Sequence, residues 1–260
     1  AVVEPMKLSV NTEKWADLKN RNPPRPQSRL AEEEIRRQVN DLLARGVIEY
    51  SWSTEYSQVL MVKKKPLDPN LRFCLDFRRL NDATECVDTW PLPNIKQMIE
   101  RVGRRKPKYF GNMDLTAGYH QFGLNKDARV FTAFICFLGI FQWCRVPMGL
   151  KGAGSYFKRQ MAMTVLVGLV SIACELYLDD VLVYGDSEFE FMKNLRSVFM
   201  RFRKHKVLLK PNKCAFGMSK IEFVRHTISE EGVSFSREKL QTALGFPRPV
   251  TQQQLRQFIG

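Results

Sequence analysis

The chain has 260 residues, enough for one or two domains with a substantial buried core. Lys and Arg number 41 against 27 Asp and Glu, and the net charge of +14 favours a polyanion such as nucleic acid as the partner. The longest uncharged stretches, 131–144 and 161–174, have 14 residues each, whereas a membrane span needs roughly 20. Composition therefore argues against a membrane protein and leaves a nucleic-acid binder or a merely soluble basic protein.

Six cysteines form no C-x-x-C pair, and there are only three histidines, so a zinc site is not expected. Reduced thiols in an intracellular protein are the simpler interpretation. No signal peptide is recognisable. Because the chain begins without a methionine and ends inside an apparent helix, we expect it to be a piece of a longer protein.

The first part of the chain predicts an extended lead-in, a helix and a basic hairpin. Prolines at positions 5, 23, 24 and 26 favour an extended segment. A helix that packs on a sheet is expected next, because acidic residues 32–34 precede an apolar stripe and Gly46 can serve as a left-handed cap. Residues 59–65 and 71–77 then form strands around a Pro/Asp/Asn turn, with lysines on one arm and Arg72 on the other. Such lysines are either functional or a solvated edge that discourages aggregation.

The middle of the chain predicts a helix from Asn94 to about Val102, followed by a strand over 109–115 that ends in an acid, Asp114. Between them lies a basic run made of Arg101, Arg104, Arg105, Lys106 and Lys108. This run either tracks a phosphodiester backbone or forms a solvated loop, and we favour the loop.

Residues 174–184 form the stretch around which the chain is organised: an apolar run, Asp179 and Asp180, then another apolar run. The flanks have strand composition, so we expect a tight hairpin with the two acids in its turn. Paired Asp is a poor choice for such a turn, which prefers Asn-Gly or Asp-Gly. Local rules break most often at functional sites, although these acids alone could simply decorate a solvated turn.

Asp114 changes that balance, because three carboxylates at strand ends repel one another unless cations lie between them. Oxygen-only ligands suit Mg²⁺ or Mn²⁺ better than zinc. Two such ions about 3.5–4 Å apart are the arrangement used in metal-assisted phosphoryl transfer.

The last part of the chain predicts an amphipathic helix from Glu188, with an apolar stripe that ends near Phe202. A second hairpin is expected from strand 222–229, a Glu-Glu-Gly turn and strand 233–236. Gly149, Gly152 and Gly154 match neither phosphate-loop pattern, so we expect no such loop there. The resemblance carried by the segments below implies a further helix, which begins over 155–163.

Three segments, in this order, resemble the reverse transcriptases of gypsy-type LTR retrotransposons: FGNMDLTAGYHQ (110–121), VPMGLK (146–151) and YLDDV (177–181). The resemblance is nearly chain-long, and D-F-R-x-L-N at 76–81, interpreted as structural, extends it. It implies an α+β fold, namely the fingers and palm of a right-hand polymerase with an antiparallel palm sheet backed by helices and the start of a thumb or connection. The implied boundaries are 1–27 lead-in, 28–87 fingers, 88–121 palm, 122–152 fingers, 153–236 palm with the primer-grip hairpin, and 237–260 incomplete thumb or connection.

The resemblance also implies the site residues. Two Mg²⁺ or Mn²⁺ ions would be held by the catalytic Asp114, Asp179 and Asp180. The nucleotide would be bound by Lys64, Arg72, Ala117, Gly118, Tyr119 and Met148, with Tyr119 excluding ribonucleotides; which of Lys63, Lys64 and Lys65 reaches the triphosphate stays open. The primer grip would be Val224, Arg225 and His226, where arginine replaces the family's usual glycine.

The expected activity is template-directed DNA synthesis on RNA or DNA, with a primed template and deoxynucleoside triphosphates as partners and no membrane. The expected location is intracellular, in a cytoplasmic particle or the nucleus, and the oligomeric state stays open. Two alternatives remain: an inactive remnant that binds nucleic acid, and an RNA-templated RNA polymerase on the same palm.

Overall fold

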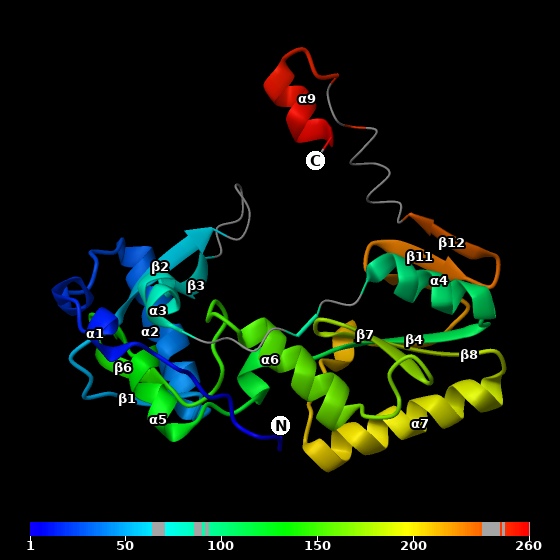
Figure 1. Cartoon of the computed structure of the whole chain (residues 1–260), viewed down its shortest axis with the longest axis horizontal. Helices are drawn as coiled ribbons and strands as arrows, with labels where there is room; N and C mark the ends of the chain where they lie inside the picture. Colours follow the sequence, from blue (N-terminus) through cyan, green and yellow to red (C-terminus); the bar gives the residue numbers. More distant parts are fainter. Residues whose placement is uncertain (64–70, 86–89, 92–93, 236–244, 246–247, 260) are drawn as a thin grey trace. The chain divides into compact units, whose positions relative to one another are not determined.

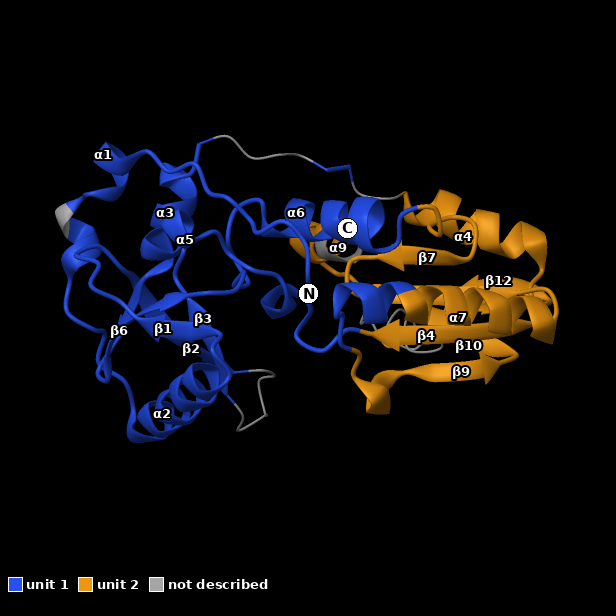
Figure 2. Ribbon diagram, turned by 90° about the horizontal axis from the view of Figure 1, so that it is seen from below, with its two compact units in different colours: residues 1–92, 115–167, 201–208 blue, residues 93–114, 168–200, 209–260 orange. Residues whose placement is uncertain are grey.

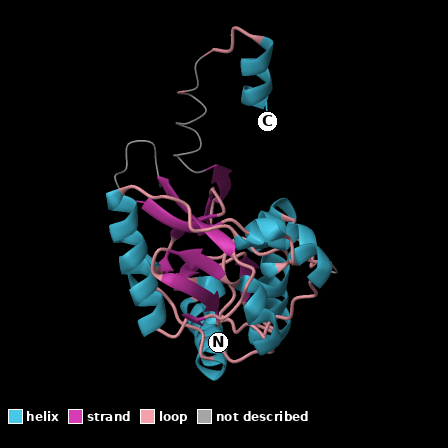
Figure 3. Cartoon of the chain, turned by 90° about the vertical axis from the view of Figure 1, so that its left-hand side faces the viewer, coloured by secondary structure: helices cyan, strands magenta, loops and turns pink. Residues whose placement is uncertain are grey.

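A computed structural model describes all residues except 64–70, 86–89, 92–93, 236–244, 246–247 and 260. The chain folds into two compact units, each assembled from three separate segments (Figure 2). Unit 1 comprises Ala1–Leu92, Leu115–Val167 and Arg201–Leu208, and unit 2 comprises Pro93–Asp114, Gly168–Met200 and Leu209–Gly260. Both units combine helices with β-sheet, and Figure 3 colours the helices and strands of the chain separately. Among the described residues, none of the helices has the length and apolarity needed to cross a membrane.

Unit 1 is organised around a five-stranded sheet in the order β1-β6-β5-β2-β3, in which only the β2–β5 pair is parallel. Its strands are β1 (Ile48–Tyr50), β2 (Ser57–Lys63), β3 (Leu71–Leu75), β5 (Phe134–Cys136) and β6 (Gly139–Trp143). Its helical elements are α1 (Thr12–Trp15), η1 (Leu18–Arg21), α2 (Arg29–Ala44), α3 (Arg78–Ala83), η2 (Gly118–Gln121), α5 (Lys126–Arg129), η3 (Val130–Thr132), α6 (Ala153–Gln160) and the π-helix η4 (Met161–Val165).

The α2 helix forms for the reasons visible in its sequence. The Ser28 hydroxyl accepts a hydrogen bond from the amide of Ala31 and caps the helix, and Ile35 and Val39 are buried on its apolar face. Gly46 follows the C-terminus with φ of +60°, the left-handed conformation that glycine adopts at little cost. The predicted helix and its glycine cap are confirmed.

Unit 2 contains a four-stranded antiparallel sheet in the order β7-β8-β4-β9 and a three-stranded antiparallel sheet in the order β10-β11-β12. The strands are β4 (Tyr109–Asp114), β7 (Cys174–Tyr177), β8 (Asp180–Gly185), β9 (Ala215–Met218), β10 (Lys220–Phe223), β11 (His226–Ser229) and β12 (Gly232–Phe235). The helical elements are α4 (Ile95–Arg105), α7 (Glu188–His205, in this unit up to Met200), η5 (Pro211–Lys213) and α9 (Gln252–Ile259).

The two faces of the four-stranded sheet are covered by different helices, and Figure 1 shows α4 and α7 on opposite sides of β4 and β8. Leu182 and Tyr184 of β8 share a buried cluster with Met98 and Val102 of α4. On the other face, the ring of Phe191 in α7 lies 6.3 Å from that of Tyr109 in β4. The expected α+β architecture, with an antiparallel sheet backed by helices, is confirmed.

Two expectations about strands and helices need correction. The predicted strand 222–229 is two strands, β10 and β11, joined by a tight turn at Val224 and Arg225, because Phe223 pairs with His226. The predicted helix over 155–163 begins earlier, at Ala153, and continues as a π-helix to Val165. Its N-cap is Gly152, with φ of +83°, and Gly149 has φ of +92°, so these two glycines serve the turn into the helix, while Gly154 lies within α6.

Candidate active site

The carboxylates of Asp114 and Asp180 are brought together by the pairing of β4 with β8. The register places the two residues directly opposite each other, at the end of β4 and the start of β8. Side chains of directly opposed residues in an antiparallel pair lie on the same face, with Cβ atoms about 4.5–5.5 Å apart. The 65 residues between them in sequence therefore do not separate them in space.

Asp179 occupies the turn between β7 and β8. Tyr177 pairs with Asp180, so the two loop residues are Leu178 and Asp179, and Asp180 is the first residue of β8. The prediction that both acids form the turn is wrong by one residue. The positive φ that such a turn requires, 54°, falls on Leu178, a conformation uncommon for a residue other than glycine.

Asp114, Asp179 and Asp180 together form what we call the carboxylate corner, and its electrostatics are unfavourable to negative charge. Burial, reinforced by the neighbouring charges of Asp179 and Asp114, raises the pKa of Asp180 from 3.8 to about 6, and Lys213 opposes this shift. The Lys213 Nζ atom lies 3.1 Å from Asp114 Oδ2, and the Lys210 amide donates to the Asp114 carbonyl at 2.9 Å. One ammonium thus partly offsets three carboxylates.

Lys213 is a site residue that the sequence interpretation missed. It lies 99 residues beyond Asp114, at the end of the short η5 turn that precedes β9. The pairing of β9 with β4 brings it to the strand end. A lone lysine in a chain this rich in lysine and arginine carries no recognisable signal, so only the fold identifies it.

The donor set of this corner fits a hard divalent cation, because it consists of carboxylate oxygens whose mutual repulsion a cation would relieve. In the part of the chain that the structure describes, no three acidic, histidine or cysteine side chains converge closely enough to hold an ion on their own.

Those of the expected nucleotide-binding residues that the structure describes fall in unit 1. Ala117 has φ of 44° and precedes the short η2 helix, a backbone shape that turns successive amides toward one side. The Tyr119 ring packs against Phe157 with centroids 4.9 Å apart, which fixes the position of the ring. Met148 is 62% exposed.

The basic hairpin of unit 1 is described only in part. Arg72 pairs with Val62 across β2 and β3, while Lys64 and Lys65 lie outside the described residues. The expectation for Lys64 therefore stays a prediction.

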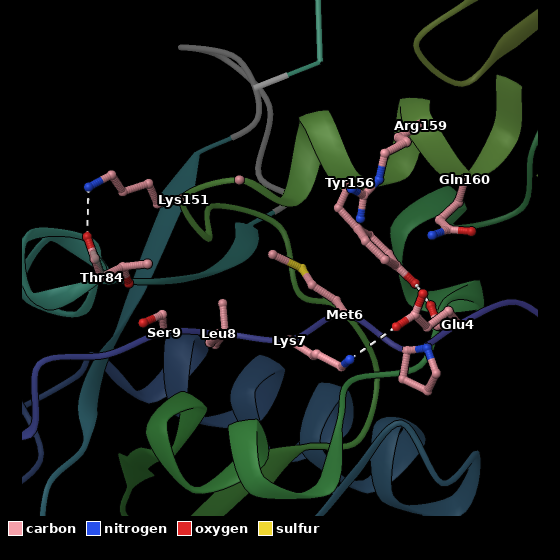
Figure 4. Close-up of a pocket in the computed structure, with 12 residues that line it drawn as sticks. Glu4, Met6, Lys7, Leu8, Ser9, Thr84, Lys151, Tyr156, Arg159 and Gln160 are labelled. Carbon is pink, nitrogen blue, oxygen red and sulfur yellow. Dashed lines mark hydrogen bonds and ion pairs between the residues drawn. The ribbon is translucent and has the colours of Figure 1, made fainter. Parts of the chain in front are cut away.

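Asn81 explains why the D-F-R-x-L-N segment is structural. Its side-chain amide donates to the Gly149 carbonyl at 2.8 Å, and its Oδ1 accepts from the Lys151 amide at 2.7 Å. A neighbouring cavity has a volume of about 450 Å³, and at its edge the Lys151 ammonium donates to the Thr84 carbonyl at 2.8 Å. Figure 4 shows these two residues among those that line the cavity. The loop before α6 is thus tied to α3, and Lys151 is used for this link.

The expected primer-grip turn is strained. Val224 and Arg225 have φ of 48° and 60°, although neither is glycine and Val224 is β-branched. The Val224 side chain packs against the buried cluster that includes Phe223 and Ile228. His226 Nδ1 lies 2.8 Å from the Val224 carbonyl oxygen.

Residues 62–260 match the family model described as reverse transcriptase (RNA-dependent DNA polymerase). The chain belongs to the reverse transcriptase family. The retrovirus-related Pol polyprotein from transposon 412 of Drosophila melanogaster is 34% identical over 88% of this chain and 18% of its own length. The corresponding polyprotein from transposon gypsy of the same organism is 30% identical over 87% of this chain and 22% of its own length.

A solved structure of the foamy viral protease-reverse transcriptase in complex with RNA/DNA hybrid superposes with a TM-score of 0.80 at 21% identity. The match covers 100% of this chain and 33% of the foamy viral chain, and it shows that the fold is that of the reverse transcriptase fingers and palm. Our reverse transcriptase chain spans about a fifth of the length of the curated polyproteins it matches.

Proposed function

We propose that this chain carries the polymerase centre of a gypsy-type retrotransposon and catalyses template-directed DNA synthesis on RNA or DNA. The observation that carries the proposal is the register of β4 with β8, which sets Asp114 opposite Asp180 with Asp179 in the adjoining turn. Family membership supports the choice of reaction, because the matching family model is described as RNA-dependent DNA polymerase.

Asp114 and Asp179 would ligate two Mg²⁺ or Mn²⁺ ions, and Asp180 would assist. When bound, the metal ions would lower the pKa of the primer 3′-hydroxyl and neutralise phosphate charge. The chain's own residues supply positioning: the sheet holds the carboxylates in place, and Lys213 limits their repulsion until a cation binds. No side-chain nucleophile is required.

The partners would be a primed RNA or DNA template and deoxynucleoside triphosphates. Arg72, with one of the neighbouring lysines, would hold the triphosphate. Tyr119 would exclude a 2′-hydroxyl, Ala117 and Gly118 would present amides, and Met148 would contact the base. We also propose that the fingers, the palm and the start of the thumb or connection occupy the residue ranges that the resemblance implies.

The primer end would be held by the turn at Val224–His226.

The described cysteines are all free thiols, which supports an intracellular location in a particle or the nucleus.

A primer-extension assay on an RNA template, with Mg²⁺ or Mn²⁺ and with EDTA as the control, tests this function. We expect metal-dependent extension with deoxynucleotides. Binding of template-primer without extension would instead identify an inactive remnant, and efficient use of ribonucleotides would identify an RNA polymerase.

A further inference from the structure

Two arginines one turn apart on α4, Arg101 and Arg105, make contacts inside unit 2. Arg101 donates from Nε and Nη2 to the two carboxylate oxygens of Glu175 in β7, at 2.8 Å each. The Glu175 side chain is only 2% exposed, and the Tyr184 hydroxyl lies 3.4 Å from the same carboxylate. The expectation that this basic run is a solvated loop or a phosphate track is wrong for these two residues, because both are engaged by the protein itself.

Arg105 links α4 to the open end of the β7–β8 hairpin. Its guanidinium donates to the Ile172 carbonyl, just before β7, at 3.3 Å. It also contacts Asp186, just after β8, at 3.3 Å and Glu190 in α7 at 2.6 Å. The strands that carry the Leu178–Asp179 turn are therefore fixed to α4 at their middle and at their open end.

The same helix packs on the primer-grip hairpin. Met98 and Val102 of α4 share one buried cluster with Phe223 and Ile228, which belong to the two strands that the Val224–Arg225 turn joins. Figure 1 shows α4 beside β11 and β12. A Cβ atom at Gly103 would lie only 3.1 Å from the Val233 side chain, so α4 and β12 approach closely there.

The nature of the Arg101–Glu175 link indicates a role in orientation. A buried ion pair loses much of its Coulomb energy to desolvation, and an apolar pair of similar volume often stabilises as well or better. What the ion pair adds is direction, because two parallel N–H···O bonds fix both side chains in one geometry. Glu175 pairs with Leu182, and Tyr177 with Asp180, so strand alternation places Glu175 on the same sheet face as Asp180.

We propose that Arg101 and Glu175 are positioning residues, which hold the Asp179–Asp180 corner in a fixed orientation relative to the primer-grip turn through α4. This inference rests on the proposed polymerase function for its catalytic consequence. Its structural consequence, a rigid carboxylate corner, is independent of that function.

The test compares two variants. In the double variant Arg101→Leu/Glu175→Leu, no buried charge is left alone, so the chain is expected to fold. The matched control is Arg104→Leu on the same helix, because the Arg104 side chain is 82% exposed and its ion-pair partner among the described residues is Glu100, at 4.0 Å.

Three measurements are made on both variants: amide hydrogen exchange at 177–181, Mn²⁺ affinity by electron paramagnetic resonance, and the kinetics of primer extension. For the double variant we expect faster exchange, and a loss of about 10- to 100-fold in Mn²⁺ affinity and kcat, as when the groups that orient metal ligands are removed. The KM for nucleotide should change by less than about twofold, because a positioning defect acts on the reacting atoms. The control should match wild type throughout.

A purely structural role would give a different result: the double variant would retain wild-type hydrogen exchange at 177–181 and wild-type Mn²⁺ affinity, and the proposal would then be overturned. These two readouts need no catalysis, so they decide the proposal even if wild type binds template-primer without extending it. In that case the proposed function fails separately. Arg101→Lys, which keeps the charge but loses the planar fork, should show the same defects in milder form.

Discussion

Asp76 in unit 1 and Asp180 in unit 2 are the same residue type in opposite electrostatic environments. Asp76 accepts hydrogen bonds from the Arg78 guanidinium at 2.8 and 2.7 Å, with Arg25 at 3.4 Å, and these contacts lower its pKa to about 2. Asp180 is half-buried beside two further carboxylates, and its pKa rises to about 6. One carboxylate stabilises its unit at neutral pH, whereas the other destabilises its unit in the absence of a cation. The difference distinguishes a structural acid from a candidate metal ligand.

The largest expected effect comes from removing one acid of the unfavourable corner. Asp114→Asn or Asp179→Asn should lower primer extension by at least about 10²–10³-fold, the cost typical of losing one group that stabilises developing charge. The fold should be kept, because neither change opens a cavity. Single-turnover extension and circular dichroism measure the two quantities, and near-normal synthesis by either variant would contradict the site.

Asp180→Asn should stabilise the folded protein when no cation is bound. Removing one of three neighbouring negative charges relieves repulsion, so in EDTA at pH 7.5 the free energy of unfolding should rise by about 1 kcal/mol, allowing for solvent screening. Asp179→Asn serves as the matched variant and should stabilise less, because Asp179 is exposed in the turn. Urea unfolding measures both. A destabilised Asp180→Asn protein would show that the corner is not strained by charge.

Asp76→Asn should destabilise the folded protein at neutral pH by about 1 kcal/mol, since the ion pair is partly exposed. The folded pKa is depressed, from 3.8 to about 2, so the stabilising contribution is present above pH 3.8 and lost as pH falls toward 2. The gap between wild type and variant, followed by urea unfolding from pH 7 downward, should therefore close below pH 3.8. Asp82→Asn, an exposed acid in α3, is the control, and a gap that does not vary with pH would exclude the ion pair as its cause.

The smallest effect is expected at the primer-grip turn, where the strain lies in the backbone and not in charge. Arg225→Gly should raise the free energy of unfolding by about 0.5 kcal/mol, because glycine accepts φ of 60° but also gains freedom in the unfolded chain. Extension at matched template-primer occupancy should rise as well. Unchanged or lower extension would show that the Arg225 side chain is tolerated or useful at that position.

Sequence patterns predicted much of this molecule because its strands are strongly apolar and acidic residues lie at their ends. Asp114 at the end of β4, the β7–β8 hairpin and the helix capped by Gly46 were all predictable from local composition. The exact position of the turn was not predictable, because Leu178 has strand propensity and its residue type does not indicate a positive φ. Only the pairing of Tyr177 with Asp180 in the structure identifies the two turn residues.

Contacts between distant parts of the chain escaped prediction for a different reason. Lys213 and Asp114 are 99 residues apart, and Arg101 and Glu175 are 74 apart. No periodicity connects such residues, and a basic run on the end of a helix has the same composition whether it faces solvent or a buried glutamate. Tertiary pairing decides their role.

The pairing of β9 with β4 has a consequence for how the molecule is made. The strand that ends in Asp114 has its second neighbour only at residues 215–218, after all of the central segment of unit 1 has been synthesised. Such non-local pairing is slow to form and leaves strand edges exposed in the meantime. On the ribosome, β4 therefore waits with one open edge, beside its partner β8, until residue 218 emerges. A nascent chain cut short before that point would expose a hydrogen-bonding edge to other chains, which makes premature termination in this region a route to aggregation.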